Sequence, residues 1–365
     1  ASALDAVDAG ARRGAPRGAA ASARCPHDAA WTDGLRRFVA RRGRACAAVD
    51  AAELSAGDFE KRFLQAAQFG EPVVIRGGAH DWALVNASFD TLQRRFGGRV
   101  VKVSVAPNGE FDVVEPAALW RSGGDGDDAD VLVRPAHMCS RLAAALDLVQ
   151  SPIRSRIAAH GGGGSGVGKA TASATAAKFY IEYVDLLTLG ARVANDLREP
   201  EWLRQLDLAN IKLWLGGGCA AARAKIHFDP VENLMVQLSG RKTFVLFHPR
   251  DAGALHFNPL GLREASLRFS FDEGFVRPAP SRDMARVTVN FAPVNISAPD
   301  FDRFPRLAEA TPVACTIDAG DVLYVPSFWW HEVISEAAAG TPNLAVNFWY
   351  TARRARLASG SLKLD

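Results

Sequence analysis

Hydrophobic and polar residues alternate in many short runs along the second half of the chain, from about residue 178 onward. These runs include KFYIEYV, KIHFD, NLMVQLSG, KTFVLFHP and NLAVNFWYT. A period of two is typical of β-strands that bury one face, and turn signals such as SGRK and DAGD separate the runs. Closely spaced strands with few intervening helices predict an antiparallel barrel or sandwich rather than a parallel α/β sheet.

The first half of the chain has a different pattern. Apolar residues between 33 and 70 recur at helical spacing, which predicts two helices, and the runs PVVIRG and RVVKVSVAP predict strands on either side of a helix near residues 89–96. Residues 121–130 and 160–177 are rich in glycine and have the composition of flexible insertions. We therefore divide the chain into a basic tail (1–32), an α/β region (33–177), a barrel (178–352) and a C-terminal tail (353–365).

The composition is that of an ordinary globular protein. Of its 365 residues, 48% are hydrophobic and 23% are charged, and the formal net charge is +3. Such a small charge, with both signs interspersed, does not indicate a dedicated nucleic-acid binder. No stretch approaches the roughly 18 apolar residues of a membrane span, so we expect a soluble, intracellular protein.

The N-terminal tail bears on the compartment. Residues 9–27 contain four arginines, many alanines and no acidic residue. Organellar transit peptides have this composition and so do disordered basic tails, and both interpretations stay open. We expect the protein in the cytoplasm, with the nucleus or an organelle as alternatives because of this tail.

The five cysteines are odd in number, widely spread and never arranged as C-x-x-C. This distribution does not indicate a disulfide framework or a zinc knuckle. It favours a reducing compartment.

The stretch KIHFDPVENL contains the strongest chemical signal. His227 and Asp229 are two positions apart in a predicted strand, so their side chains share one face with Cα atoms roughly 6.6 Å apart. His331 follows in the strand-like stretch GDVLYVPSFWWHEVIS. Two histidines and one carboxylate form the facial triad of non-haem Fe(II) oxygenases, which leaves three sites of an octahedral ion open. The competing interpretation is a chance pairing of a core histidine with a turn aspartate.

Three linked segments carry a family resemblance. IHFDPVENLMVQLSGRKTFVLFHP, GDVLYVPSFWWHEV and LAVNFWY resemble, in order and spacing, the JmjC members of the Fe(II)- and 2-oxoglutarate-dependent oxygenases. The resemblance extends over roughly residues 70–352, and the small JmjC-only lysyl hydroxylases are the most similar branch. It implies a double-stranded β-helix, a mainly β jelly-roll barrel flanked by helices.

The resemblance also implies roles for individual residues. His227, Asp229 and His331 correspond to the iron ligands, and Lys242 to the lysine that pairs with the distal carboxylate of 2-oxoglutarate. Three further cosubstrate contacts are implied, at Asn233, Asn347 and Tyr180. Without the motifs, Lys242 would be interpreted as a solvated hairpin lysine and the other three as polar residues of a barrel rim.

The chain departs from the family pattern at one position. Three residues before the first ligand, many relatives have a threonine whose hydroxyl also binds the distal carboxylate, whereas this chain has Ala224. The loss of one hydrogen bond to a charged partner costs on the order of 1–2 kcal/mol. We therefore still expect an enzyme, but the affinity for 2-oxoglutarate is the property on which Ala224 bears.

The resemblance implies an enzyme that uses Fe(II), 2-oxoglutarate and O₂ to hydroxylate a lysyl side chain of a protein partner. Translation-associated GTPases are the family precedent for that partner, and the family suggests a homodimer. Three alternatives stay open: a tRNA-base hydroxylase of the same fold, a JmjC lysine demethylase, and a non-catalytic cupin-like binding module.

Overall fold

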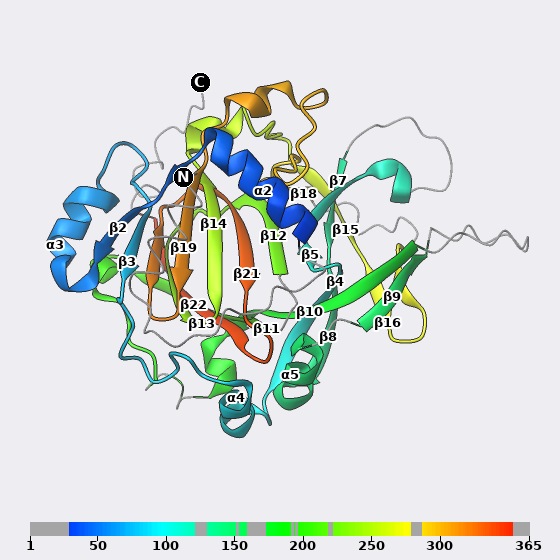
Figure 1. Cartoon of the computed structure of the whole chain (residues 1–365), viewed down its shortest axis with the longest axis horizontal. Helices are drawn as coiled ribbons and strands as arrows, with labels where there is room; N and C mark the ends of the chain where they lie inside the picture. Colours follow the sequence, from blue (N-terminus) through cyan, green and yellow to red (C-terminus); the bar gives the residue numbers. More distant parts are fainter. Residues whose placement is uncertain are drawn as a thin grey trace, which may run out of the picture.

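The computed structural model describes residues 29–120, 130–150, 153–158, 173–190, 193, 196–217, 222–278 and 287–352. Two β-sheets face each other and form a barrel (Figure 1). The smaller of the two has six strands in the order β1 (Arg44–Ala45), β19 (Val313–Asp318), β14 (Arg241–Phe247), β21 (Trp330–Glu336), β12 (Ala222–Phe228) and β5 (Glu110–Phe111). Its four central strands pair antiparallel, while the two edge strands pair parallel with their neighbours.

The second sheet has twelve strands. Four of them, which face the smaller sheet, are β11 (Leu208–Gly217), β22 (Pro342–Thr351), β13 (Val231–Ser239) and β20 (Val322–Val325). The sheet continues beyond β20 through β3 (Val73–Arg76) and β2 (Ala47–Asp50). On the other side of β11 it continues through β10 (Ser173–Asp185), β9 (Ile153–Ala158), β17 (Gly274–Val276) and β16 (Arg268–Ser270), with β4 (Val100–Pro107) and β8 (Ala136–Arg141) branching from β10. The two sets of four antiparallel strands make the jelly-roll, or double-stranded β-helix, that the sequence predicts.

Shorter elements complete the chain. A third sheet has the order β18 (Val287–Thr288), β15 (Leu262–Ser266), β7 (Asp130–Arg134) and β6 (Val113–Pro116). The α-helices are α2 (Ala29–Arg42), α3 (Ala56–Phe59), which continues into one π-helical turn at Glu60–Leu64, α4 (Phe89–Phe96) and α5 (Leu142–Gln150). Short 3₁₀ turns lie at Ala51–Glu53, Ala117–Trp120, Leu186–Leu189, Glu201–Leu203, Pro249–Ala252 and Pro305–Glu309.

Helices cover the outer faces of both sheets. Leu35 and Phe38 of α2 pack with Val245 and Phe247 of β14, so that α2 lies across the outside of the six-stranded sheet (Figure 1). Helices α4 and α5 pack against each other on the outer face of the larger sheet, where α5 contacts β10 and β11. This burial of apolar helix faces leaves the interior between the two sheets mainly to side chains from the strands and the turns that join them.

Strand alternation determines which residues enter that interior. On β14, Phe244 and Leu246 belong to the cluster between the sheets, whereas Val245 and Phe247 belong to the cluster under α2. Lys242 has the same parity as Phe244 and Leu246, and so it also points inward. A lysine in this position is placed inside the barrel by the same period of two that buries its apolar neighbours.

Several sequence predictions differ from the structure in detail. Helix α2 begins at Ala29, within the segment predicted as a tail, and β10 begins at Ser173, within the segment 160–177 predicted as a flexible insertion. Residues 1–28, 121–129, 159–172 and 353–365 lie outside the described residues. The two helices predicted between residues 33 and 70 are present, and the two short strands β1 and β2 separate them.

The cysteine prediction needs a correction. Cys46 and Cys315 form a disulfide across 269 residues of sequence, whereas we expected no disulfide. The parallel pairing of β1 with β19 sets Ala45 opposite Ala314. Cys46 and Cys315 are the next residues along the chain, so their sulfur atoms come close enough to bond. Cys139 is a free, exposed cysteine.

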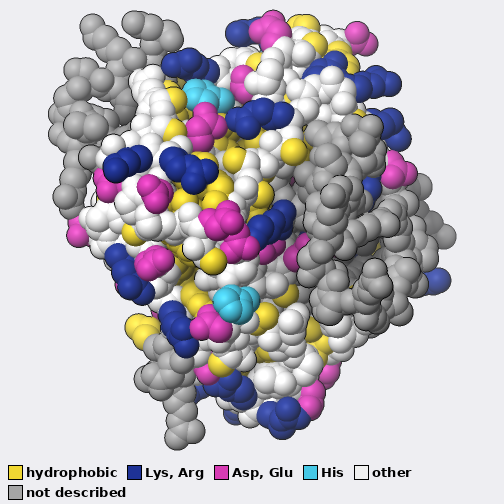
Figure 2. All heavy atoms as spheres, turned by 60° about the vertical axis from the view of Figure 1, so that its left-hand side comes forward, with side chains coloured by type: hydrophobic (Ala, Val, Ile, Leu, Met, Phe, Trp, Pro, Cys, Tyr) yellow, Lys and Arg dark blue, Asp and Glu magenta, His cyan; other side chains and the backbone are white. Residues whose placement is uncertain are grey.

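The surface has mixed charge. On the face shown in Figure 2, Lys and Arg side chains are interspersed with Asp and Glu. This arrangement agrees with the small net charge and forms no uniform basic surface on that face. Within the described ranges, the helices are all too short or too polar to cross a membrane.

Candidate functional site

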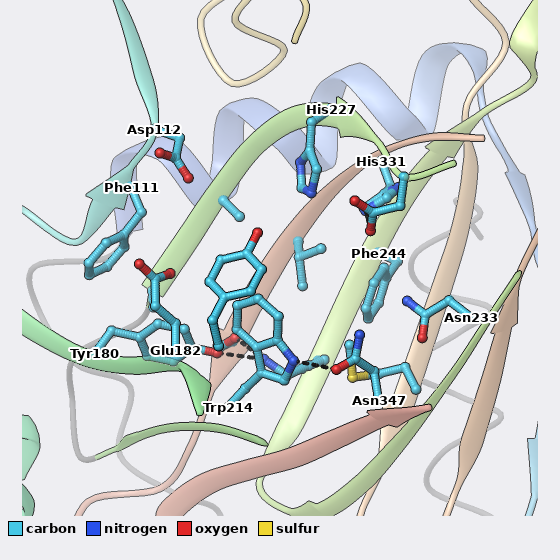
Figure 3. Close-up of a pocket in the computed structure, with 18 of the residues that line it drawn as sticks. Phe111, Asp112, Tyr180, Glu182, Trp214, His227, Asn233, Phe244, His331 and Asn347 are labelled. Carbon is cyan, nitrogen blue, oxygen red and sulfur yellow. Dashed lines mark hydrogen bonds and ion pairs between the residues drawn. The ribbon is translucent and has the colours of Figure 1, made fainter. Parts of the chain in front are cut away.

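The three side chains of the predicted triad converge inside the barrel, and Figure 3 shows the two histidines side by side. His227 on β12 and His331 on β21 are directly paired residues of neighbouring antiparallel strands, and Asp229 directly follows β12. One ligand atom from each residue lies within 4.8 Å of the others, and His331 Nε2 is 3.7 Å from an Asp229 carboxylate oxygen. This spacing is compatible with one metal ion between two imidazoles and one carboxylate.

Backbone carbonyls hold both imidazoles in the orientation that a metal requires. His227 Nδ1 is 2.7 Å from the Lys225 carbonyl oxygen, and His331 Nδ1 is 2.9 Å from the Trp329 carbonyl oxygen. Because a carbonyl only accepts, each Nδ1 carries the proton and each Nε2 keeps its lone pair for a ligand bond. Burial and the neighbouring His227 lower the pKa of His331 to about 4, so this imidazole is neutral near pH 7, the form that binds metal.

A β-bulge turns the first histidine into the barrel. Simple alternation along β12 from Ala222 and Ala224, which both line the pocket, would direct Ile226 inward and His227 outward. The pairing register with β21 shifts between Ala224 and His227, and Ile226 instead packs in the cluster under α2. Bulges next to active sites re-aim side chains in this way.

The triad opens into a pocket whose empty space, including its open mouth, is about 660 Å³. All seven residues singled out from the sequence line it: His227, Asp229, His331, Lys242, Asn233, Asn347 and Tyr180. They come from six strands and one turn, and the fold brings them all together.

Lys242 is the most unusual charge in this pocket. Its side chain is only 2% exposed, and its ammonium donates hydrogen bonds to the Tyr180 hydroxyl at 3.0 Å and to the Ser335 hydroxyl. No carboxylate forms an ion pair with it among the residues described, and burial lowers its pKa to about 7. A buried ammonium with only neutral partners is costly, so this position favours an anionic ligand.

Two buried amide side chains, of Asn347 and Asn233, each have one atom without a hydrogen-bond partner. Trp214 Nε1 donates to Asn347 Oδ1 at 2.8 Å, which fixes the orientation of that amide because an indole N–H only donates. Asn347 Nδ2 and Asn233 Oδ1 are then buried without a hydrogen-bond partner in the structure. Buried polar atoms are nearly always satisfied, so both atoms indicate a ligand that enters the pocket between them and the triad.

Other lining residues were not found from the sequence. Ser335 faces Lys242 across the β14–β21 pair, and Asp112, Glu182, Tyr183 and Trp214 line the opposite wall. Ser335 has a weak sequence signal, because it lies four positions after His331 and therefore on the same face of β21. The others come from elements whose position relative to the triad is set only by tertiary structure.

Comparison with known proteins gives the class. Residues 58–356 match the family described as a cupin-like domain, and the chain belongs to this family. Its curated relatives carry the JmjC form of the domain, so the resemblance in the three sequence motifs and the predicted barrel are confirmed. JmjC-domain homologues are 2-oxoglutarate-dependent oxygenases that use Fe(II).

Three relatives illustrate the range. The human bifunctional peptidase and (3S)-lysyl hydroxylase JMJD7 is 35% identical over 140 residues, which cover 38% of this chain and 41% of the relative. Human tRNA wybutosine-synthesizing protein 5 is 32% identical over 123 residues (34% and 29%), and the Arabidopsis thaliana lysine-specific demethylase JMJ31 is 29% identical over 158 residues (43% and 23%). The matched segments thus span less than half of each of these relatives.

Proposed function

We propose that this protein is an Fe(II)- and 2-oxoglutarate-dependent oxygenase that hydroxylates a lysyl side chain of a protein partner. The observation that carries the first part is Lys242, an ammonium inside the barrel with no ion-pairing carboxylate among the described residues. A dicarboxylate that reaches from the triad to Lys242 satisfies both ends of the pocket at once. A non-catalytic binding module has no such need for a buried, unpaired cation.

The donor set fits an iron ion. Two neutral imidazole nitrogens, of His227 and His331, and one carboxylate oxygen, of Asp229, are the set that non-haem Fe(II) sites use. When bound, Fe(II) with 2-oxoglutarate and O₂ supplies the oxidising chemistry that converts a substrate C–H group into C–OH. The protein contributes the ligands, the neutral tautomers held by backbone carbonyls, and a largely buried pocket that limits access of water.

The remaining polar residues orient the cosubstrate. Lys242 neutralises its distal carboxylate, and the hydroxyl of Tyr180 contacts the same group. The free Asn347 Nδ2 donates to the carboxylate near the metal, and Asn233 is a second contact that donates from its Nδ2, since its unpartnered Oδ1 only accepts. Each assignment follows from a side chain that is buried, lines the pocket and has hydrogen-bonding capacity to spare.

Ser335 replaces the hydroxyl that Ala224 lacks. Both residues line the pocket, and the Ser335 hydroxyl already lies within hydrogen-bond distance of the Lys242 ammonium. A serine on the neighbouring strand therefore offers the distal carboxylate the hydrogen bond that a threonine at position 224 would give. We expect 2-oxoglutarate affinity to be retained despite the departure at Ala224.

The lysyl substrate rests on the similarity to the human lysyl hydroxylase, over 38% of this chain. A tRNA-base hydroxylase is the second candidate, because tRNA wybutosine-synthesizing protein 5 is similar over a comparable length. A lysine demethylase is the third, because of the similarity to JMJ31. All three candidates share the metal and cosubstrate proposed above and differ in what enters the mouth of the pocket.

The first experiment is a titration of 2-oxoglutarate against protein loaded with Fe(II) or with Mn(II). Saturable binding that is lost in His227→Ala and Asp229→Ala supports the oxygenase, whereas no binding at millimolar concentrations favours a module without turnover. Mass spectrometry of a lysate incubated with and without 2-oxoglutarate then tests the substrate. The expected product is a lysine that carries one added oxygen atom, and a modified tRNA base instead would favour the second candidate.

A further inference from the structure

The wall of the pocket that faces away from β14 is both acidic and aromatic. Asp112 and Glu182 direct their carboxylates into the space beside Phe111 and Trp214 (Figure 3). The rings of Tyr183 and Trp214 are 4.5 Å apart. Metal and cosubstrate binding, as proposed above, use none of these five residues directly.

Glu182 is the central residue of this wall. It is 7% exposed, and Ser104 Oγ donates a hydrogen bond to one of its carboxylate oxygens at 2.6 Å. No Lys or Arg side chain forms an ion pair with it in the part of the chain that the structure describes. Burial, followed by the nearby Asp112, raises the pKa of Glu182 to about 7, and the Ser104 hydrogen bond and the charges of Lys102 and Arg134 offset only part of this rise.

The neighbouring cations are already engaged. Arg134 forms ion pairs with both Asp112, at 2.9 Å, and Glu264, at 2.6 Å. Lys102 extends over the outer side of the Tyr183 ring, 5.9 Å from its centre. With Arg134 shared between two other carboxylates, Glu182 has no ion-pair partner of its own among the described residues, and a cationic ligand would stabilise its ionised form.

Two residues of this wall have an unusual backbone conformation. Asp112 and Tyr183 have φ values of 58° and 54°, in the left-handed region that costs energy for residues with a side chain. The register of β10 against β11 shifts between Ile181 and Val184, and this irregularity brings Tyr183 to the pocket beside Glu182 although the two are adjacent in sequence. The left-handed conformations at Asp112 and Tyr183 therefore contribute to the shape of this wall.

A hydrogen-bond donor without a partner lies on the same wall. Trp349 Nε1 is buried in the pocket lining and has no hydrogen-bond acceptor in the structure. Its indole is 6.1 Å from the Tyr183 ring, measured between ring centres. A ligand that supplies both a cation for Glu182 and an acceptor for Trp349 would satisfy the whole wall.

We infer that Glu182, with the Tyr183, Trp214 and Trp349 rings around it, is the specificity-determining group that selects a basic side chain as the substrate of this pocket. The ammonium of a lysyl residue pairs with the Glu182 carboxylate, its methylene chain lies against the rings, and a peptide carbonyl accepts from Trp349 Nε1. Aromatic faces attract cations as well as covering methylene groups, so the rings add to the same preference. The inference rests on the proposed oxygenase function and specifies which side chain that function acts on.

The test measures binding rather than turnover. The full-length protein, loaded with Zn(II) as a redox-inert metal, is titrated with N-acetyl-L-lysine N-methylamide and, separately, with the neutral norleucine analogue, and binding is followed by ligand-observed NMR. The wild-type chain is expected to prefer the lysine probe about tenfold or more, a ratio equal to about 1.4 kcal/mol. Glu182→Gln, which keeps the shape of the side chain and the Ser104 hydrogen bond, is expected to reduce the preference to less than about threefold.

Asp185→Asn is the matched control, because Asp185 lies on the same strand but pairs with Lys212 outside the pocket. It should keep the wild-type preference. Equal binding of the two probes by the wild-type chain, no detectable binding of the lysine probe, or an unchanged preference in Glu182→Gln would each overturn the inference. So would tighter binding of a neutral purine nucleoside, which would point to the tRNA-base alternative.

The proposed oxygenase function is tested independently in the same samples, by measuring the binding of 2-oxoglutarate. A chain that binds 2-oxoglutarate but does not prefer lysine refutes the inference alone. A chain that prefers lysine but does not bind 2-oxoglutarate refutes the oxygenase and leaves Glu182 as the recognition group of a lysine-binding module.

Discussion

Replacing Lys242 by methionine should have opposite effects on the stability of the free protein and on its affinity for 2-oxoglutarate. Burial lowers the pKa of Lys242 from 10.5 to about 7, and at about 1.4 kcal/mol for each pH unit this corresponds to about 5 kcal/mol of lost stabilisation of the ammonium in the pocket without its ligand. A carboxylate that binds beside the ammonium recovers part of this free energy. Removing one partner of a buried pair typically costs about 3–5 kcal/mol, so the dissociation constant of 2-oxoglutarate should rise about 10²- to 10⁴-fold in Lys242→Met.

The free protein should respond in the opposite direction. Methionine fills a similar volume without a charge, so the free energy of unfolding of Lys242→Met at pH 7 should exceed that of the wild-type chain. The lost hydrogen bonds to Tyr180 and Ser335 offset only part of this gain, because both hydroxyls can pair with each other or with water. Higher stability together with weaker cosubstrate binding is a pattern that general damage to the fold does not produce.

The assay is calorimetric titration of 2-oxoglutarate into Mn(II)-loaded protein, with urea unfolding of the same samples. Lys212→Met is the control, since Lys212 pairs with Asp185 at 3.2 Å on the other side of the pocket wall and does not line the pocket. Its dissociation constant should match that of the wild type. An unchanged dissociation constant in Lys242→Met would refute the assignment of Lys242 as the carboxylate partner.

Three further predictions follow from buried groups. Because the pKa of Lys242 is lower in the folded chain than in the unfolded chain, the unfolded chain binds more protons between about pH 7 and 10.5, and the wild type should gain about 2 kcal/mol of stability from pH 7 to 9 relative to Lys242→Met in urea melts. Glu232 is buried and accepts hydrogen bonds from Ser327 N and Oγ, so Glu232→Ala should lower the free energy of unfolding by about 2–4 kcal/mol and weaken Mn(II) binding, because the loop from Ser327 leads into β21. Cys46→Ser should lower the stability of the oxidised protein by about 2–4 kcal/mol, and equal melting of variant and wild type without reductant would argue against the Cys46–Cys315 bond.

The strands of the barrel were predicted from alternation in the sequence, whereas Lys242 was assigned only through the family resemblance, although the same alternation accounts for its inward position. In KTFVLF the apolar residues alternate between two buried faces, and a lysine in phase with Phe244 and Leu246 must share the barrel interior with them. The helix at Phe89–Phe96 was equally visible, since its apolar spacing and the Ser88 cap act within eight residues. Local patterns of this kind depend on neighbours in the sequence alone.

Features that depend on pairing between distant strands were not accessible. The residues of KIHFD do not predict the bulge that turns His227 inward, because the bulge is a property of the register between β12 and β21. Glu182 in KFYIEYV resembles the polar position of a half-exposed strand, and only the packing of β4 and β11 on both sides of β10 buries it. The disulfide was missed because cysteine spacing carries no information about two strands paired across most of the chain.

The cross-strand pairing of His227 with His331 also has a consequence for biosynthesis. The two proposed ligands are 104 residues apart (331 − 227), and β21 must lie between β12 and β14 before both can reach one ion. A nascent chain that has not yet added its last two strands therefore lacks the complete proposed site, so on this proposal iron would bind a nearly finished barrel rather than guide its early collapse. Any truncated chain that ends before residue 330 should therefore stay without metal at this site, even where the rest of its fold has formed.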